Sequence, residues 1–279
     1  MTDHKYATPF TMLHAANLLG QRSRLIKFKQ AIDRVVKKGD YVVDIGTGSG
    51  VLAILAAKAG ASRVSAIDVN PEALHYAKSA ARANDVDDVI EFVESHFADY
   101  SPTDKADVVI CEMLSSMMLV EQQIPASHHA TQTILKPNGI LLPKEINVYI
   151  VPVECPEIWD RFQFEGLKFP RVVQTATPDA TRDLADMQIL ETFDLTNLPE
   201  KPLVDKVSNF MVESSGTIHG IVGAFESQLY GDILLTMEDG WKQLFIPLPY
   251  PIDVSKEDIF SLRISYEPGK YDSLIIETL

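Results

Sequence analysis

An acidic residue and three glycines form a motif in the segment Tyr41–Gly50, which reads YVVDIGTGSG. The apolar and β-branched residues at its start, up to Asp44, predict a buried parallel strand. The glycines then allow a sharp turn and a close approach to a ligand, because they have no Cβ atom. The Ala- and Leu-rich segment 51–59 predicts a helix that packs back on the sheet and ends at Gly60.

A second predicted strand, Arg63–Ile67, ends at Asp68, where an acid is placed to bind the hydroxyls of a ribose. The two features together predict a site for a ligand of the adenosine type. The dinucleotide fingerprint requires G-x-G-x-x-G, whereas the glycines here are spaced G-x-G-x-G with Asp44 beside them. A compact loop next to an acid favours S-adenosylmethionine, which has an amino group and no pyrophosphate, over NAD. A tight turn that binds nothing is the alternative.

Two glutamates bracket an apolar run in the segment Cys111–Glu121, which reads CEMLSSMMLVE and follows a predicted strand. A carboxylate pair can hold a planar cation, and guanidinium matches carboxylates because it presents five N–H donors in a fork. Taken singly, each glutamate could be a solvated residue at a helix end. The position of Glu112 at the end of a strand favours a functional role, and that of Glu121 does so less.

The elements that must position these residues alternate between strands and helices. Asn70 and Pro71 predict the start of one helix, because Asn is a favoured cap and Pro a favoured first residue. Another helix contains Ile124 and Ile134, and two more are predicted between Pro9 and Lys38, over the glycine loop. The predicted strands are Tyr41–Ile45, Arg63–Ile67, Ile90–Val93, Ala106–Cys111 and Ile140–Leu142. Such alternation implies an α/β fold with a doubly wound, Rossmann-like parallel sheet, whose ligands bind at the carboxyl ends of the strands.

The pattern changes at Pro143, after which short segments alternate between apolar and polar residues. Such segments, separated by turn residues, predict an antiparallel β-barrel or sandwich. They are Asn147–Val153, Val204–Val212, Thr217–Phe225, Gln228–Thr236, Gln243–Leu248, Ile259–Ser265 and Ser273–Glu277. A helix is predicted around Trp159–Leu167 and a polar loop around Thr177–Arg182. We therefore predict two domains, residues 1–143 and 144–279.

Composition narrows the classes of function. The formal charge of −14 argues against binding to duplex DNA or to a membrane surface, and it fits a cationic or neutral substrate. The two cysteines provide no disulfide framework, which predicts a reducing cytoplasm. Met1–Lys5 lacks the pattern of a signal peptide, and no apolar run is long enough to span a bilayer. The adjacent His128 and His129 point in different directions on a helix, so no metal site is predicted.

Several motifs, taken in order, resemble those of the protein arginine methyltransferases. Asp44–Gly50 and Ala56–Ala61 look like the family's cofactor loop and the helix that follows it. Glu112 and Glu121 are similar in position and spacing to its paired-glutamate loop. The remaining matches are Arg24 with Ala31–Ile32, the KPNGILLP segment Lys136–Pro143 that leads into the β-barrel, and Trp241–Gln243 at the end of the threonine–histidine–tryptophan loop.

The resemblance implies a function and a set of site residues. The chain would be an S-adenosylmethionine-dependent N-methyltransferase of the protein-arginine type, with a protein or small cationic substrate and a homodimer as its assembly. Residues 1–143 would bind the cofactor, and residues 144–279 would serve substrate binding and dimerisation. The implied catalytic residues are Glu112 and Glu121, and the implied cofactor-binding residues are Arg24, Asp44, Gly46, Thr47, Gly48, Asp68, Val69 and Phe97. Of these, Arg24 would bind the cofactor's carboxylate, Asp68 the ribose and Phe97 the adenine.

The sequence departs from the family pattern at several positions. The family's histidine before the tryptophan is Gly240 here, and the acid that pairs with it falls at Gln21. The glutamate expected to hold the adenine amino group falls near Ala98. These departures keep two alternatives open: a methyltransferase for a small molecule or another protein site, and an inactive S-adenosylmethionine-binding regulatory protein.

Overall fold

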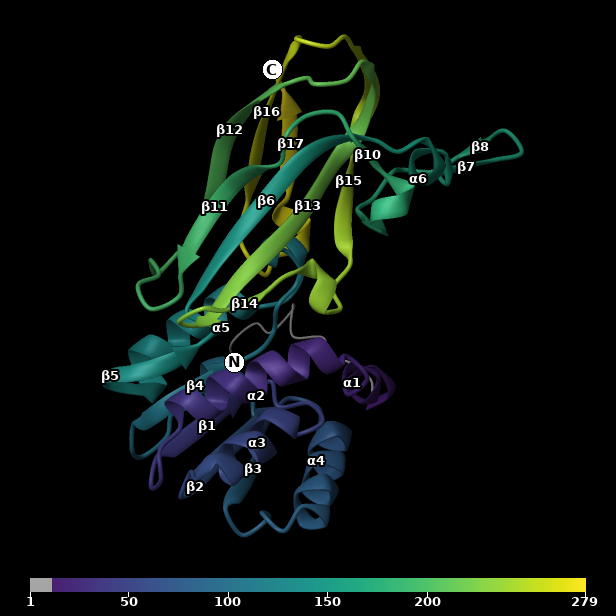
Figure 1. Cartoon of the computed structure of the whole chain (residues 1–279). Helices are drawn as coiled ribbons and strands as arrows, with labels where there is room; N and C mark the ends of the chain where they lie inside the picture. Colours follow the sequence, from purple (N-terminus) through teal and green to yellow (C-terminus); the bar gives the residue numbers. More distant parts are fainter. Residues whose placement is uncertain (1–11) are drawn as a thin grey trace.

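The fold, a computed structural model that describes residues 12–279, consists of an α/β half and a β-rich half (Figure 1). The predicted start of the first helix at Pro9 and the segment Met1–Lys5 lie outside the described residues. The buried side chains of the two halves form one continuous cluster, which includes Ile45 and Ile110 from one half and Ile146 and Phe225 from the other. The two halves therefore share a core.

The α/β half is built on a five-stranded parallel sheet with the order β3-β2-β1-β4-β5. Its strands are β1 (Tyr41–Ile45), β2 (Arg63–Asp68), β3 (Ile90–Glu94), β4 (Ala106–Cys111) and β5 (Leu135–Leu142). The direction of winding reverses between β1 and β4, and ligands of such sheets bind at this point, beyond the carboxyl ends of the strands. The predicted doubly wound sheet is confirmed, although β5 begins five residues earlier than the predicted Ile140.

Local signals explain the helices that pack on this sheet. They are α1 (Met12–Leu18), α2 (Arg22–Val35), α3 (Val51–Ala59), α4 (Pro71–Ala83) and α5 (Gln123–His129), the last continued by a π-helical turn, η3 (Ala130–Ile134). The side chain of Asn70 accepts hydrogen bonds from the amides of Glu72 and Ala73, as expected for a cap. Gly50 has φ +79°, and a Cβ there would lie 2.8 Å from the Cβ of Ala77. Only glycine fits where α4 packs so closely against the start of α3.

The β-rich half contains a seven-stranded antiparallel sheet, a three-stranded sheet and a projecting hairpin (Figure 1). The long strands are β6 (Glu145–Glu154), β11 (Gln188–Asp194), β12 (Val204–Met211), β13 (Gly216–Tyr230), β15 (Gln243–Val254) and β16 (Ile259–Tyr266). The short ones are β7 (Gln163–Phe164), β8 (Leu167–Lys168), β9 (Gln174–Ala176), β10 (Arg182–Asp183), β14 (Ile233–Leu235) and β17 (Ile275–Thr278). The predicted antiparallel β region is confirmed. The division at residue 143 stays a prediction, and Pro143 lies between β5 and β6.

The predicted helix around Trp159–Leu167 is wrong. Helix α6 (Pro156–Asp160) is only five residues long, and the chain then forms the hairpin β7–β8. The turn consists of Glu165 and Gly166, which have φ 50° and 82°. Two consecutive positive φ values are typical of a tight hairpin turn and incompatible with a helix.

The predicted break between two strands near Phe225 is also wrong, because β13 runs without interruption to Tyr230. Its residues Glu226 and Ser227 pair with Asn147 and Ile146 of β6, so that segment stays in the sheet. The chain turns only at Gly231, after which β14 pairs back on β13. The sequence analysis also missed β11, which pairs with β6 along most of its length.

Two predicted absences can be compared with the described part of the chain. Among residues 12–279, no helix combines the length and the apolar character that a bilayer crossing requires. The same residues contain no cluster of His, Cys, Asp or Glu side chains arranged to hold a metal ion. Cys111 and Cys155 are both buried and unpaired with each other.

Candidate functional site

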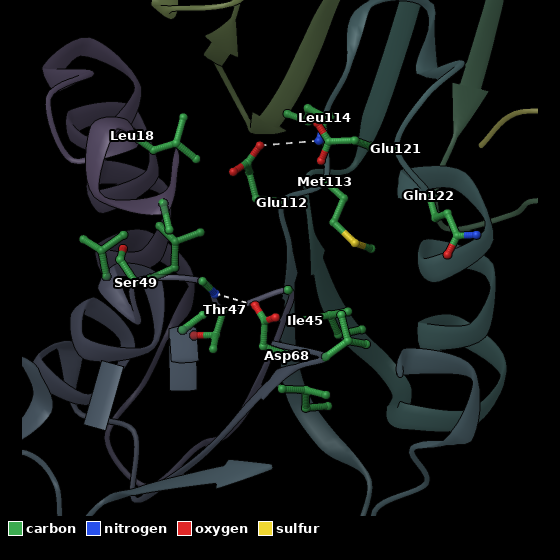
Figure 2. A pocket seen from close by; sticks show the side chains of 18 of the residues that line it. Leu18, Ile45, Thr47, Ser49, Asp68, Glu112, Met113, Leu114, Glu121 and Gln122 are labelled. Carbon is green, nitrogen blue, oxygen red and sulfur yellow. Dashed lines mark hydrogen bonds between the residues drawn. The ribbon is translucent and has the colours of Figure 1, made fainter. Parts of the chain in front are cut away.

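A cavity of about 830 Å³ opens at the carboxyl ends of β1, β2 and β4, between the two halves of the molecule. It is within the size range of small-molecule and cofactor sites. In Figure 2, Thr47 and Asp68 lie below the cavity and Glu112 and Glu121 lie above it. The predicted site residues that line it are Arg24, Gly46, Thr47, Gly48, Asp68, Val69, Phe97, Glu112 and Glu121. Asp44 is the one predicted site residue that does not line the cavity.

Asp44 lies beneath the glycine loop and is almost completely buried. The hydroxyl of Thr47 donates a hydrogen bond of 2.6 Å to Asp44 Oδ2. Burial raises the pKa of Asp44 to about 7, although the hydrogen bond from Thr47 acts in the opposite direction. Asp44 therefore holds Thr47 in place from behind, and it contributes to the site through the shape of the loop.

The glycine loop is fixed to the end of β2. The amides of Gly46 and Thr47 both donate to the carbonyl oxygen of Ile67, each at 2.9 Å. The amide of Gly48 donates to Asp68 Oδ2 at 2.8 Å, and the amide of Asn70 donates to Asp68 Oδ1 at 2.9 Å. These bonds place the Asp68 carboxylate in the cavity wall next to the loop. This is the arrangement that binding of a ribose requires.

The loop between the two glutamates contains a 3₁₀ turn, η2 (Ser116–Met118), with an unusual backbone. Met117 and Met118 have φ 61° and 52°, a region that residues with a Cβ rarely adopt. The β-rich half holds both residues: the hydroxyl of Tyr266 donates to the Met117 carbonyl at 2.7 Å, and the amide of Gly269 donates to the Met118 carbonyl at 2.9 Å. A Cβ on Gly223 of β13 would lie 2.2 Å from Met117 Sδ. The β-rich half therefore provides both the hydrogen bonds and the space for this turn.

Further contacts fix the two ends of the glutamate loop. Trp241 Nε1 donates to the carbonyl of Leu114 at 2.8 Å, and the Ser116 hydroxyl donates to the carbonyl of Lys242 at 2.5 Å. On the other side, the amide of Met113 donates to the side chain of Gln123 at 2.8 Å. The loop that carries Glu112 and Glu121 is thus positioned by both halves. Of these partners, the sequence analysis named only the Trp241–Gln243 segment.

Arg24 places a guanidinium group next to Glu112. Its Nη2 forms an ion pair with Glu112 Oε2, its Nη1 donates to Gln21 Oε1 at 3.1 Å, and its Cζ lies 4.7 Å from the centre of the Trp241 ring. Burial lowers the pKa of Arg24 to about 10, and the charge of Glu121 acts in the opposite direction. Arg24 is therefore charged at neutral pH. The acidic and aromatic groups of this corner form a binding site for a planar cation.

Glu121 lies on the same side of the cavity in an environment that disfavours its charge. Burial raises the pKa of Glu121 to about 7, and the neighbouring Arg24 charge lowers it. Strongly shifted carboxyl pKa values in a cleft are characteristic of functional sites.

The two positions where the sequence departs from the family's dyad are in contact. Gln21 Nε2 donates to the carbonyl of Gly240 at 3.2 Å, and a Cβ on Gly240 would lie 2.5 Å from Gln21 Cδ. A different pair links α2 to the β-rich half nearby, because Lys27 Nζ donates to Asp239 Oδ2 at 2.6 Å and Ser23 donates to Asp239 Oδ1. The start of α2 and the loop that contains Gly240 are thus joined by these hydrogen bonds.

The sequence of this chain is similar to those of known methyltransferases. The model of the family described as ribosomal protein L11 methyltransferase (PrmA) matches residues 29–150. Protein arginine N-methyltransferase PRMT10 of Oryza sativa subsp. japonica is 33% identical over 150 residues, which cover 53% of this chain and 39% of that protein. The arginine N(omega)-methyltransferase of Streptomyces achromogenes subsp. streptozoticus is 26% identical over 270 residues, which cover 89% of this chain and 74% of that protein. The chain thus spans well under half the length of the plant relative.

Two solved structures have the same fold. The Trypanosoma brucei PRMT1 enzyme–prozyme heterotetrameric complex with AdoHcy matches with a TM-score of 0.76 and 17% identity, covering 94% of this chain and 96% of that chain. Arabidopsis thaliana protein arginine methyltransferase 10, in a uniquely open conformation, matches with a TM-score of 0.77 and 20% identity, covering 99% and 97%. The resemblance to the protein arginine methyltransferases is confirmed, and the fold is that of these enzymes.

Proposed function

We propose that the chain is an S-adenosylmethionine-dependent N-methyltransferase whose acceptor is a guanidinium group of the arginine type. The observation that carries this proposal is the corner formed by Glu112, Glu121 and Trp241. A guanidinium, that of Arg24, is already paired with Glu112 and stacked on the Trp241 ring. A guanidinium can stack its plane on an aromatic ring while its forked N–H groups pair with carboxylates, and this combination distinguishes it from a compact ammonium.

The residues of the cavity fit the proposed cofactor. Asp68 offers a carboxylate to a ribose, the amides and glycines of the loop permit a close approach by the methionine part, and Arg24 offers a cation to its carboxylate. When bound, the cofactor supplies an electrophilic methyl group on its sulfonium. Assignment of Asp44, Gly46, Thr47, Gly48, Val69 and Phe97 to cofactor binding remains a proposal, with Asp44 acting through Thr47.

The two glutamates bind the acceptor guanidinium and prepare one of its nitrogens for methyl transfer. A guanidinium is a poor nucleophile because it is protonated, and carboxylates that bind two of its nitrogens draw the positive charge away from the third. Each charge-assisted hydrogen bond contributes about 1.5–3 kcal/mol. Holding the third nitrogen in line with the methyl group contributes roughly 7–11 kcal/mol. Glu121 Oε, with its pKa near neutrality, is suited to accept the proton that the methylated nitrogen loses.

The proposed activity can be tested with labelled cofactor. We expect label to be transferred to free L-arginine, to an arginine-containing peptide or to proteins of a host extract, with the modified atom identified by mass spectrometry. No transfer to any guanidinium acceptor, together with tight binding of the cofactor, would instead support the inactive regulatory protein.

A small guanidino acceptor is the second candidate. The relative that aligns over 74% of its own length is named for arginine, whereas the plant relative named for protein arginine aligns over 39%. The two departures from the family pattern, Gln21 and Gly240, also lie close to Glu112. Gln21 contacts both Gly240 and Arg24, and Arg24 pairs with Glu112. Faster transfer to free arginine than to any peptide or protein would favour this candidate.

Two further properties are proposed on separate observations. The hairpin β7–β8 projects from the β-rich half (Figure 1), and its Phe164 and Leu167 are 68% and 59% exposed, which supports a role in homodimer formation. The two unpaired cysteines support a reducing compartment such as the cytoplasm.

We expect the methylation rate to depend on pH through Glu121. Only ionised Glu121 binds a guanidinium, and its pKa is raised to about 7, so kcat/KM for the acceptor should rise about tenfold per pH unit below this value and level off above it. Asp44 titrates in the same range, so the Glu121→Gln variant is needed to separate the two groups. The residual kcat/KM of this variant should no longer rise with pH. A wild-type kcat/KM that is constant from about pH 6 to pH 8 would contradict this assignment.

A further inference from the structure

The loops that follow β3 and β4 meet through the side chains of His96 and Gln122, which both line the cavity. His96 Nε2 lies 3.1 Å from Gln122 Oε1, and the amide of Ala98 donates to His96 Nδ1 at 3.2 Å. Because Nδ1 accepts, a neutral His96 carries its proton on Nε2 and donates it to Gln122 Oε1. The orientation of the Gln122 amide is therefore fixed by a chain of hydrogen bonds that begins at the backbone of Ala98.

Packing limits the freedom of this pair. The rings of His96 and Phe97 have centroids 4.2 Å apart, and the buried Phe97 ring also lies 6.1 Å from that of His129. Gly269 packs against Gln122 from the β-rich half, since a Cβ there would lie 3.3 Å from both Cα and Cγ of Gln122. Gln122 is thus held in a defined position in the lining of the cavity, and Figure 2 shows it beside Glu121, on the far side of Met113 from Glu112 and Asp68.

In the proposed function, different walls of the cavity bind different parts of the cofactor. The glycine loop and Arg24 are assigned to the methionine part, and Asp68 is assigned to the ribose. The loops that follow β3 and β4 contribute the polar residues Ser95, His96 and Gln122 to the lining, and the β-rich half contributes Tyr271. The Ser95 hydroxyl donates to the carbonyl of His96 at 3.0 Å, whereas the Gln122 carboxamide offers a donor and an acceptor side by side, as an adenine edge does.

We propose that Gln122, oriented by His96, recognises the adenine ring of the cofactor. A carboxamide binds adenine through two hydrogen bonds, because its oxygen accepts from the exocyclic amine and its nitrogen donates to an adjacent ring nitrogen. Gln122 Oε1 has two lone pairs, one for His96 and one for the amine. Ala98, at the position where a glutamate is expected, has no side-chain acceptor. This proposal rests on the proposed function, since it assumes an adenosyl cofactor in the cavity.

The experiment compares two ligands that differ at the exocyclic amine. Dissociation constants for S-adenosyl-L-homocysteine and S-inosyl-L-homocysteine, in which a carbonyl replaces the amine, are measured by calorimetry. We expect wild-type protein to prefer the adenosyl ligand by about 10- to 100-fold. Gln122→Leu, which keeps the size of the side chain without its polar atoms, should reduce this preference to about threefold or less. Gln122→Glu, which keeps the acceptor, should retain most of it.

Controls separate recognition from folding. Val120→Ala changes a residue that lines the same cavity near Glu121, and it should leave the preference unchanged. If Gln122→Leu does not fold, as judged by its melting curve, Gln122→Ser gives the same comparison with a smaller side chain. A Gln122→Leu or Gln122→Ser protein with the full wild-type preference would overturn the proposal, as would a wild-type protein with none. Failure of wild-type protein to bind either ligand would overturn the proposed function itself.

Discussion

Glu112→Gln is expected to lower kcat/KM for methyl transfer by about 100- to 10,000-fold while leaving cofactor affinity unchanged or slightly higher. The substitution keeps the shape of the side chain but removes its charge, and the new NH₂ group faces the donors of the guanidinium. Loss of two charge-assisted hydrogen bonds, at about 1.5–3 kcal/mol each, gives an effect of this size. Affinity for the cofactor is retained because Arg24 then has no charged partner at Glu112 and is more available to the cofactor's carboxylate.

The measurement is initial rates with labelled cofactor, together with the dissociation constant of S-adenosyl-L-homocysteine. Glu157→Gln is the matched control, because Glu157 is a 75% exposed residue of α6 that forms an ion pair with Arg161 and does not line the cavity. It should have wild-type rates. Turnover of Glu112→Gln within about threefold of wild type would exclude the proposed role of Glu112 in binding the acceptor.

The position of Arg24 has a consequence for this site. Arg24 was assigned to the cofactor's carboxylate, but in this structure its guanidinium contacts Glu112 and the ring of Trp241. The groups proposed to bind an acceptor guanidinium therefore already bind one from the chain itself. The same Arg24 is proposed to pair with the cofactor, so binding of the cofactor's carboxylate would draw this guanidinium away from Glu112.

Features that depend on neighbouring residues could be predicted from the sequence. The glycine loop, the cap at Asn70, and the strand ends at Asp68 and Glu112 are all set by local sequence, since turns, caps and alternating burial are short-range effects. The parallel sheet follows from the alternation of strands and helices. For this reason all the predicted site residues except Asp44 line one cavity.

Features that depend on distant residues could not be predicted in this way. The left-handed backbone at Met117 requires the hydroxyl of Tyr266, 149 residues away, and the space above Gly223. No pattern in CEMLSSMMLVE indicates these partners. The contact between His96 and Gln122 joins two residues that are 26 positions apart, and it depends on how the sheet brings the two loops to the same edge. The β7–β8 hairpin was not predicted, because its two-residue turn at Glu165 and Gly166 lies inside the segment for which a helix was predicted.

Asp68→Ala is expected to weaken binding of S-adenosyl-L-homocysteine by about 100-fold or more. The carboxylate offers charge-assisted hydrogen bonds to two ribose hydroxyls, and it also accepts from the amides of Gly48 and Asn70. The substitution removes the ribose contacts and releases the glycine loop from β2, so the loop loses the order that binding requires.

The measurement is calorimetry, with melting curves to confirm that the variant folds. Asp33→Ala serves as the control, because Asp33 is a 48% exposed residue of α2 whose ion pair with Lys29 lies outside the cavity. A dissociation constant for Asp68→Ala within about threefold of wild type would place the ribose elsewhere. Asp68 and Glu112 lie on opposite walls of the cavity, so the effects of their substitutions should differ. Asp68→Ala should raise the dissociation constant of the cofactor, whereas Glu112→Gln should slow transfer from the bound cofactor. If both variants changed cofactor affinity alone, the glutamates would be part of the cofactor site and the acceptor would have to bind elsewhere.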